Sequence, residues 1–273
     1  MSDAKEIRLL LSDVDGTLVT NDKMLTEGAI SAAQALRAAG VALAVTSSRP
    51  ARGMGMLVRP LDLQLPLAGC NGGVLVNPDM TVIETRLIDP AAAKIIVDFL
   101  LQQGLDIWVY TETEWLVRDP QAPHVARERF ILRFDATVVS EFTDAHLHHA
   151  VKIVGVCDDY PLIASSEAAA RSLLGETASA TRSAAYFLDV TNPLANKGQV
   201  VHTLAERLGI SPAQIATIGD MQNDVLMFRQ SGFSIAMGNA ADDVKAQAGA
   251  VTDSNQNDGW AKAVRKFLLQ GGA

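Results

Sequence analysis

The segment Leu9–Leu18 constrains the fold of this chain more than any other. An apolar run ends in two carboxylates one residue apart, Asp13 and Asp15, and a glycine and a threonine follow. A continuous apolar run is typical of a parallel strand that is buried on both faces. Ligands of open α/β sheets bind at the carboxyl ends of their strands. The segment therefore predicts an α/β sheet with a functional site where this strand ends.

The two carboxylates taken alone also fit three other kinds of structure. A calcium-binding loop begins Asp-x-Asp as well, but it needs glycine at its sixth position and glutamate at its twelfth. This chain has Leu18 and Met24 there, which excludes that loop. No Gly-x-x-x-x-Gly-Lys-Ser/Thr sequence supports a nucleotide-binding P-loop. A solvent-exposed turn needs only Asp and Gly, so the pair alone does not distinguish a turn from a site.

Composition limits the class of protein. The chain has 273 residues, enough for one large domain or two smaller ones, and 48% of them are hydrophobic. Its net charge of −8, without a basic run, makes nucleic acid or an anionic membrane an unfavourable partner. No apolar stretch reaches the roughly 18 residues of a membrane span, and residues 1–6 do not resemble a signal peptide. We therefore expect a cytoplasmic protein.

Strands and helices are predicted to alternate at both ends of the chain. Near the amino end, Thr26 caps a helix that ends at about residue 39, and strands follow at 41–46 and 65–69. Polar residues follow these strands: Ser47, Ser48, Arg49 and Asn71. Near the carboxyl end, a helix opens at Lys197, and strands are expected at 215–218, 234–237 and 251–252 before a closing helix at 260–269. Asp220, Asn223 and Asp224 follow the first of these strands.

The middle of the chain has a different order of elements. It predicts a helix at 89–104, a hairpin at 105–118, a polar helix at 123–130, a strand at 151–157 and a helix at 161–174. This order favours an antiparallel sheet with helices on one side. We therefore predict a Rossmann-like doubly wound parallel sheet formed by residues 1–81 and 187–273. An α+β cap domain at 82–186 is inserted into it.

The predicted topology brings polar groups from distant segments to one sheet edge. Asp13 and Asp15 meet Ser47, Lys197 and the Asp220/Asp224 pair there. Several carboxylates form a hard-oxygen site that suits Mg²⁺. A hydroxyl and an ammonium beside such an ion would bind phosphoryl oxygens. A glycosidase also uses paired carboxylates, but two separate acidic clusters and a lysine fit a metal site better.

The motifs resemble those of the haloacid dehalogenase (HAD) superfamily, specifically its Cof-like phosphohydrolases with a type IIB cap. Asp13–Thr17 matches the family's Asp-x-Asp-Gly-Thr, and Ser47–Pro50 resembles Thr-Gly-Arg-Pro, with Ser48 in place of the usual glycine. Lys197-Gly198 and Gly219–Asp224 (Gly-Asp-Met-Gln-Asn-Asp) match the third and fourth motifs. Two further matches are Asn71-Gly72 and the segment Met237–Ala240. Only the core carries these matches.

The resemblance implies a mechanism and a cofactor. Asp13 would attack phosphorus and become an aspartyl-phosphate, and Asp15 would act as general acid and base. Mg²⁺ would be held by Asp13, the backbone carbonyl of Asp15 and Asp220, with Asp224 in support. Residues implied to bind the substrate phosphate are Ser47, Ser48, Arg49, Asn71, Lys197 and Asn223. The expected substrate is a phosphate monoester of a small metabolite, for example a sugar phosphate.

Two alternatives and several details remain open from the sequence. A phosphomutase shares these motifs, and a non-catalytic binding or regulatory protein can share the fold. A monomer and a homodimer are equally compatible with the sequence. Cap residues that could contact the leaving group are Arg118, His124, Arg127, Lys152 and Arg182. The segment His146–His149 is expected to be a solvated surface rather than a metal site, and Cys70 and Cys157 are expected to be buried apolar residues.

Overall fold

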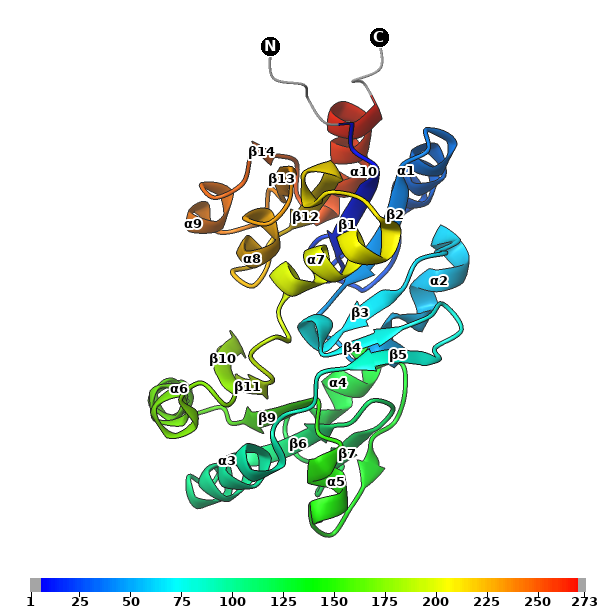
Figure 1. The fold of residues 1–273 in the computed structure, drawn as a ribbon. Coiled ribbons are helices and arrows are strands. Elements are labelled where there is room, and N and C mark those ends of the chain that lie inside the picture. Colours follow the sequence, from blue (N-terminus) through cyan, green and yellow to red (C-terminus); the bar gives the residue numbers. More distant parts are fainter. Residues whose placement is uncertain (1–5, 270–273) are drawn as a thin grey trace.

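A computed structural model describes residues 6–269 of the chain. The first five residues, on which part of the expectation about a signal peptide rests, lie outside this range. The described residues form two lobes, with the core uppermost and the cap below it in Figure 1. None of the described helices combines the length and the apolarity that a membrane crossing requires.

The core is built on an eight-stranded sheet. Counted from one edge, neighbouring strands are parallel as far as the sixth strand. The seventh and the eighth strand are each antiparallel to the strand before them. In spatial order they are β14 (Ala250–Val251), β13 (Phe233–Ala236), β12 (Ile215–Gly219), β1 (Leu9–Asp13), β2 (Ala42–Thr46), β3 (Leu67–Gly69), β4 (Val74–Val76) and β5 (Val82–Thr85). The strand predicted to be buried on both faces is β1, which lies inside the sheet between β12 and β2.

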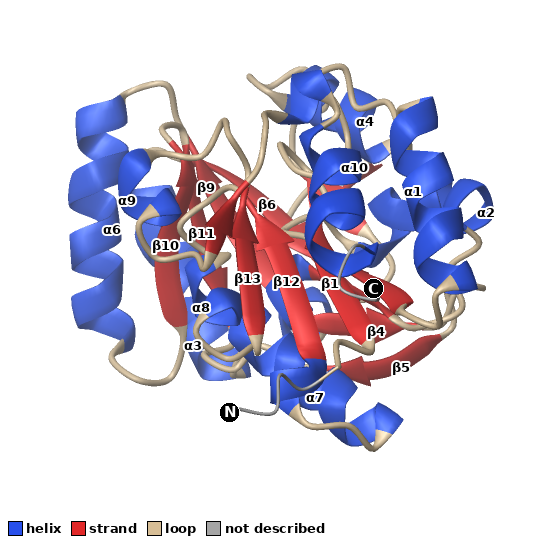
Figure 2. Cartoon of the chain, turned by 90° about the horizontal axis from the view of Figure 1, so that it is seen from above, coloured by secondary structure: helices blue, strands red, loops and turns tan. Residues whose placement is uncertain are grey.

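Helices cover both faces of this sheet because β1 is apolar on both sides. Leu10 packs into one hydrophobic cluster, whereas Leu9 and Leu11 pack into another on the opposite face. The first face is covered by α1 (Glu27–Ala38), α2 (Gly55–Leu61) and α10 (Gly259–Ala263), which continues as a π-helix (Val264–Leu269). The second is covered by α7 (Lys197–Leu208), α8 (Val225–Phe228) and α9 (Asp242–Lys245). This is the predicted doubly wound fold (Figure 2).

The cap is a separate six-stranded sheet, and all but one of its strand pairs are antiparallel. In spatial order its strands are β10 (Ser179–Ala184), β11 (Phe187–Thr191), β9 (Lys152–Val156), β6 (Asp106–Tyr110), β7 (Trp115–Val117) and β8 (Thr137–Val138). One face is covered by α3 (Pro90–Gln102), α5 (Asp144–His148) and α6 (Tyr160–Leu174). Part of the other face is covered by α4 (Val125–Leu132). The predicted hairpin is formed by β6 and β7.

Strand pairing differs from the predicted limits of the cap at both ends. The strand β5 (Val82–Thr85) pairs with β4 in the core sheet, although the sequence predicts residues 82–85 to belong to the cap. The strand β11 (Phe187–Thr191) pairs with β9 in the cap sheet, although the sequence predicts residues 187–191 to belong to the core. The chain therefore changes sheets after residues 85 and 191. The sequence prediction missed these strands because β5 is short and partly exposed, and the strand β10 that pairs with β11 is mostly polar.

Candidate active site

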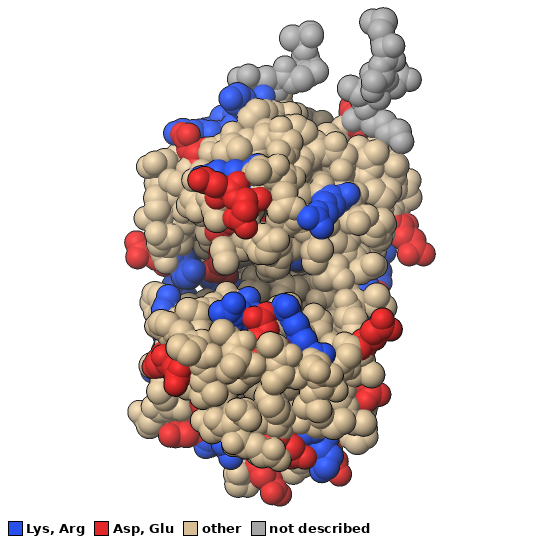
Figure 3. Space-filling model, turned by 90° about the vertical axis from the view of Figure 1, so that its left-hand side faces the viewer, with Lys and Arg blue, Asp and Glu red and all other residues tan. Residues whose placement is uncertain are grey.

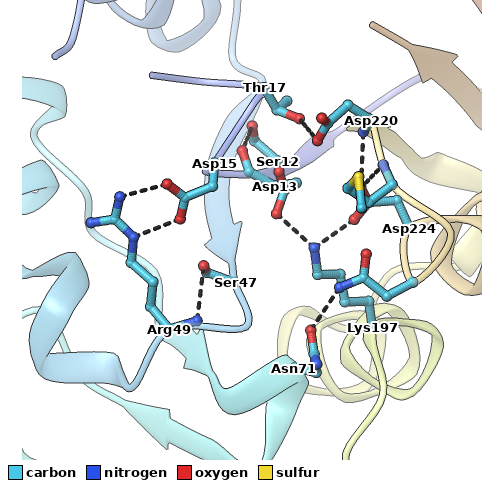
Figure 4. A network of polar contacts seen from close by, with 12 residues as sticks. Ser12, Asp13, Asp15, Thr17, Ser47, Arg49, Asn71, Lys197, Asp220 and Asp224 are labelled. Atoms are coloured by element: carbon cyan, nitrogen blue, oxygen red, sulfur yellow. Dashed lines mark hydrogen bonds and ion pairs between the residues drawn. The ribbon is translucent and has the colours of Figure 1, made fainter. Parts of the chain in front are cut away.

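The end of β1 presents the two carboxylates at the carboxyl edge of the core sheet (Figure 4). Asp13 is the last residue of β1 and is buried, and Asp15 follows it in a turn closed on the carbonyl oxygen of Val14. Gly16 has a φ of +77°, and a Cβ at that position would lie 2.3 Å from Oδ2 of Asp220. Only glycine fits both restrictions, so this turn brings the first and fourth motifs into contact.

Lys197 connects the two halves of the core. It is the first residue of α7, whose N-cap is Asn196, and its side chain is buried. Its Nζ lies 2.6 Å from Oδ1 of Asp13 and 2.6 Å from Oδ1 of Asp224. The other oxygen of Asp224 accepts hydrogen bonds from the backbone N–H groups of Asp220 and Met221, each at 2.9 Å. The ammonium thus lies between carboxylates from β1 and from the loop after β12.

Three carboxylates form a cluster with the geometry of a metal site. One oxygen from each of Asp13, Asp220 and Asp224 lies within 4.8 Å of the other two. Asp220 is held by Thr17 Oγ1 and Asn239 Nδ2, each at 3.1 Å. Oδ2 of Asp13 is buried and has no hydrogen-bond partner among residues 6–269. A buried oxygen without a donor fits a cation ligand, so this donor set fits Mg²⁺.

Electrostatics also favours a cation at this cluster. Burial raises the pKa of Asp13 well above its ordinary value; Lys197 lowers it, and Asp224 and Asp220 raise it further. Burial and the charge of Asp224 raise the pKa of Asp220 to about 6. The single ammonium of Lys197 does not balance three carboxylates, and a divalent cation would offset the remaining repulsion.

Asp15 points away from this cluster. Its carboxylate accepts two hydrogen bonds from Arg49, Nε to Oδ2 and Nη2 to Oδ1, each at 2.6 Å, and lies 2.7 Å from Nζ of Lys23. Burial acts to raise the pKa of Asp15, but Arg49 and then Lys23 outweigh it, and the pKa lies below its ordinary value. The guanidinium predicted to bind phosphate thus pairs with Asp15. Lys23 was missed because its sequence neighbours have no recognisable motif.

Arg49 also contacts the cap. Its Nη1 donates a hydrogen bond of 2.9 Å to the carbonyl oxygen of Ile131 in α4. One residue earlier, the Ser48 carbonyl accepts a hydrogen bond of 3.2 Å from Nζ of Lys152 in β9. Ser47 is buried at the end of β2, and its Oγ accepts a hydrogen bond of 3.1 Å from the backbone N–H of Arg49. The segment after β2 therefore joins Asp15 to the cap.

The turn after β3 carries the predicted Asn71 in an unusual backbone conformation. Cys70, Asn71 and Gly72 have φ values of +51°, +58° and +96°. Consecutive left-handed residues are rare outside glycine, and such strain is concentrated at functional sites. Oδ1 of Asn71 accepts a hydrogen bond of 3.0 Å from Nδ2 of Asn223. The two predicted asparagines thus contact each other, and Asn71 lies beside Lys197 (Figure 4). Cys70 is buried as expected, and burial raises its pKa to about 11, whereas Cys157 is only half-buried, contrary to the expectation.

A cleft of about 660 Å³ lies between the core and the cap. Its core wall includes Asn71, Lys197 and Asn223, and its cap wall includes Arg182 and Asp189. The other cap residues that the sequence suggested are Arg118, His124, Arg127 and Lys152, which do not line this cleft. Asp189 was missed because its strand was not predicted, although a carboxylate between Leu188 and Val190 is a recognisable signal.

The side chains of His124 and of the 146–149 segment have other contacts. The ring of His124 stacks on Tyr186 and its Nε2 lies 2.7 Å from Oδ1 of Asp158. His146 belongs to a capping box with Thr143 at the start of α5, Leu147 is buried in the cap core, and His148 and His149 are exposed. No histidine joins the potential metal cluster found within residues 6–269. The exposure of His148 and His149 agrees with the expected solvated position of these two residues, whereas Leu147 is buried.

Comparison with known proteins identifies the family. The family described as haloacid dehalogenase-like hydrolase matches residues 10–264. The chain belongs to the HAD-like hydrolases. Among its relatives, an HMP-PP phosphatase of Cronobacter sakazakii is 27% identical, over 88% of this chain and 87% of its own. A 5-amino-6-(5-phospho-D-ribitylamino)uracil phosphatase of Bacillus subtilis is 24% identical, over 96% and 98% respectively.

The comparison with solved structures shows a shared fold. A HAD subclass IIB sugar phosphatase superposes with a TM-score of 0.84 at 23% sequence identity, covering 95% of this chain and 98% of the other. The predicted Cof-like HAD membership and the fold are therefore confirmed. Since the named relatives are phosphatases, this HAD-like hydrolase is a phosphoric monoester hydrolase. The expectation of an enzyme is confirmed, which removes the non-catalytic alternative.

Proposed function

We propose that this HAD-like hydrolase is a Mg²⁺-dependent phosphatase that forms an aspartyl-phosphate on Asp13. The observation that carries the proposal is the environment of that carboxylate. Oδ1 of Asp13 is held by Lys197, while Oδ2 is buried and without a hydrogen-bond partner among the described residues. An oriented carboxylate with one uncommitted oxygen is suited to nucleophilic attack or to metal binding.

Asp13 and Asp15 have different environments, which suits them to different tasks. A carboxylate oxygen of Asp13 bonds to phosphorus, and the ester P–O bond breaks. Asp15 gives a proton to the leaving oxygen and later removes one from the water that attacks the phosphorus, which releases phosphate and restores Asp13. The ion pairs of Asp15 with Arg49 and Lys23 favour the base form. The acid form therefore requires these ion pairs to loosen.

The proposed cofactor and phosphate contacts follow from the same edge of the sheet. Asp13, Asp220 and Asp224 would hold Mg²⁺, which supplies positive charge to the transferring phosphoryl group. The carbonyl oxygen of Asp15 remains a proposed further ligand. Lys197 and the Ser47 hydroxyl would hold phosphoryl oxygens. The other proposed phosphate-binding residues are Ser48, Arg49, Asn71 and Asn223.

The proposed substrate is a small phosphorylated metabolite, in particular a sugar phosphate. A cleft of about 660 Å³ accommodates a leaving group of this size. One relative is named for a phosphorylated ribityl compound and a fold neighbour is described as a sugar phosphatase. The net charge of −8 disfavours nucleic acid as a partner, and both cysteines are free, as is usual in the cytoplasm. We leave a monomer and a homodimer open.

Phosphate release from p-nitrophenyl phosphate and from a panel of sugar phosphates tests the proposal. We expect activity that depends on Mg²⁺, and a phosphoenzyme that is trapped by acid in the unmodified protein and missing in Asp13→Asn. A matched control, Asp135→Asn, changes an exposed cap carboxylate whose side chain is 84% accessible. Substantial turnover by Asp13→Asn would remove the nucleophile assignment. Transfer of phosphate between positions of one sugar, with little release, would indicate the phosphomutase instead.

A further inference from the structure

The cap-sheet face that bears α4 changes from apolar to polar across its width. Directly paired residues of antiparallel strands lie on the same face. One such row runs through Val117, Trp108, Val154, Asp189 and Thr181. The apolar members of this row belong to the cluster covered by α4. The row ends in a buried carboxylate, Asp189, and a hydroxyl, Thr181, which do not belong to that cluster.

A neighbouring row shows the same change. It runs through Trp115, Tyr110, Lys152, Thr191 and Ser179. The polar members of both rows, apart from Lys152, line the same cleft as Lys197 of the core. Figure 3 shows the molecule hollowed between the two lobes, with charged side chains on the lower lip. The polar edge of the cap sheet is therefore the wall that faces the leaving group.

Asp189 contributes to this wall a buried carboxylate oxygen that lacks a hydrogen-bond partner among the described residues. The residue is 3% exposed, and Oδ2 lies 3.5 Å from Nζ of Lys152. Its other oxygen, Oδ1, is buried without a hydrogen-bond partner within residues 6–269. Lys152 is itself held by the Ser48 carbonyl at 3.2 Å and lies 4.8 Å from the ring centroid of Tyr110. The carboxylate is thus kept in place by a fixed cation and retains a free acceptor.

The charges around the cleft indicate which kind of ligand group would donate a hydrogen bond to Oδ1 of Asp189. Lys152 already balances the charge of Asp189, so the pair does not attract a cation strongly. The cleft arginines, Arg171 and Arg182, each donate a hydrogen bond of 2.7 Å to Glu167. Much of the remaining wall consists of hydroxyl and amide side chains: Ser179, Thr181, Ser183, Thr191, Asn71, Asn196, Gln222 and Asn223. A neutral leaving group with several hydroxyls satisfies these groups best.

We propose that Asp189 determines specificity by accepting a hydrogen bond from a hydroxyl of the leaving alcohol, so that the site selects phosphate monoesters of polyhydroxy alcohols. This proposal rests on the proposed phosphatase function. An apolar leaving group would leave Oδ1 of Asp189 unpaired, and so would an anionic group, which has no proton to donate to it. Lys152 acts as a positioning residue because it orients Asp189 from outside the cleft.

The test compares two substrates whose leaving alcohols differ only in hydroxyl content. Sorbitol 6-phosphate and n-hexyl phosphate both release a six-carbon alcohol. We expect the unmodified enzyme to prefer sorbitol 6-phosphate. Asp189→Asn keeps the size of the side chain but replaces a charged acceptor by a weaker neutral one, so it should lower kcat/KM for sorbitol 6-phosphate by about five- to tenfold, and for n-hexyl phosphate by less than about twofold. Asp135→Asn, the same substitution at an exposed cap position, should change neither value.

Thr181→Val provides a second variant if Asp189→Asn fails to fold. Thr181 is exposed on β10 and pairs directly with Asp189. We expect this variant to lower kcat/KM for sorbitol 6-phosphate by about three- to tenfold and to leave n-hexyl phosphate unchanged. Melting temperatures of all variants identify any general loss of folding.

The outcomes separate this proposal from the phosphatase function. If the unmodified enzyme hydrolyses n-hexyl or p-nitrophenyl phosphate with Mg²⁺ but shows no preference for sorbitol 6-phosphate, the specificity proposal is wrong and the phosphatase function stands. Equal losses on both substrates in Asp189→Asn, with folding retained, would assign Asp189 to cap structure and overturn the proposal. No phosphate release from any ester by the unmodified enzyme would instead reject the proposed function.

Discussion

Arg49 binds the carboxylate of Asp15 through two parallel hydrogen bonds of 2.6 Å and binds the cap through the carbonyl oxygen of Ile131 at 2.9 Å. One guanidinium therefore connects the proposed acid/base residue to the domain that covers the cleft. Bidentate pairing fixes both the position and the ionisation of a carboxylate. The arrangement makes the protonation of Asp15 sensitive to the contact between cap and core.

Replacing Arg49 should slow the hydrolysis of substrates whose leaving oxygen must be protonated more than that of substrates whose leaving group departs as an anion. In Arg49→Lys the bidentate contact that fixes the position of the Asp15 carboxylate is lost. We therefore expect kcat/KM for an alkyl phosphate to fall by about 10- to 100-fold, because the acid is no longer held in place for the leaving oxygen. Hydrolysis of p-nitrophenyl phosphate should change much less, since p-nitrophenolate leaves without a proton. The control is Arg52→Lys, because the guanidinium of Arg52 lies over the ring of Phe134 at 4.6 Å. Equal losses on both substrates would contradict the role of Arg49 at Asp15.

Mg²⁺ should stabilise the folded protein because it offsets the repulsion between Asp13, Asp220 and Asp224. A ligand at 100 times its Kd adds about 2.7 kcal/mol to the free energy of unfolding. We expect the melting temperature to rise with added Mg²⁺ and to return on chelation with EDTA. In Asp220→Asn this rise should be largely lost, whereas Asp253→Asn, which changes an exposed core carboxylate, should retain it. An unchanged shift in Asp220→Asn would argue against the metal site.

Removal of the buried ammonium should be costly for stability. Lys197→Met leaves the carboxylates of Asp13 and Asp224 without their cation, and breaking a buried ion pair costs about 3–5 kcal/mol. Urea denaturation in Mg²⁺-free buffer measures this loss. Lys94→Met replaces a lysine whose side chain is 65% accessible, and it should stay within about 0.5 kcal/mol of the unmodified protein. A similarly small effect in Lys197→Met would show that the cluster does not depend on this cation.

Glu128 should make stability depend on pH. Burial raises its pKa above the ordinary value of 4.5, although Lys152 and Tyr110 act in the opposite direction. Because the folded pKa is the higher one, its contribution is fully present below about pH 4.5 and is lost as pH rises through the folded pKa. We expect Glu128→Gln, which can still accept the hydrogen bond from the Tyr110 hydroxyl, to gain stability relative to the unmodified protein as pH rises.

The measurement is the free energy of unfolding of both proteins between pH 4 and pH 8. Glu141→Gln, at an exposed cap position, is the matched control and should run parallel to the unmodified protein. A constant difference between Glu128→Gln and the unmodified protein across this range would show that Glu128 does not titrate abnormally.

Local chemistry in the sequence was sufficient to locate the core and most of its site residues. The apolar run before Asp13 predicted β1, Thr26 predicted the start of α1, and Asn196 and Gly209 predicted both ends of α7. These signals are readable because a buried strand needs an apolar run and a helix end needs a cap. The roles proposed for these residues remain predictions that the experiments above test.

The tertiary structure decided which of those side chains contact one another. The sequence suggested phosphate binding for Arg49, but the fold places its guanidinium on Asp15, and Lys23 joins the same carboxylate. Asp189 was not recognised because β10 and β11 lack a strong apolar alternation. Its free oxygen exists only because strand pairing buries it beside Lys152.

The sequence by itself thus determined the fold class and the motif residues, since these depend on local patterns. Which side chains contact one another depends on the distances between segments far apart in the chain, and only the packed structure decides those distances.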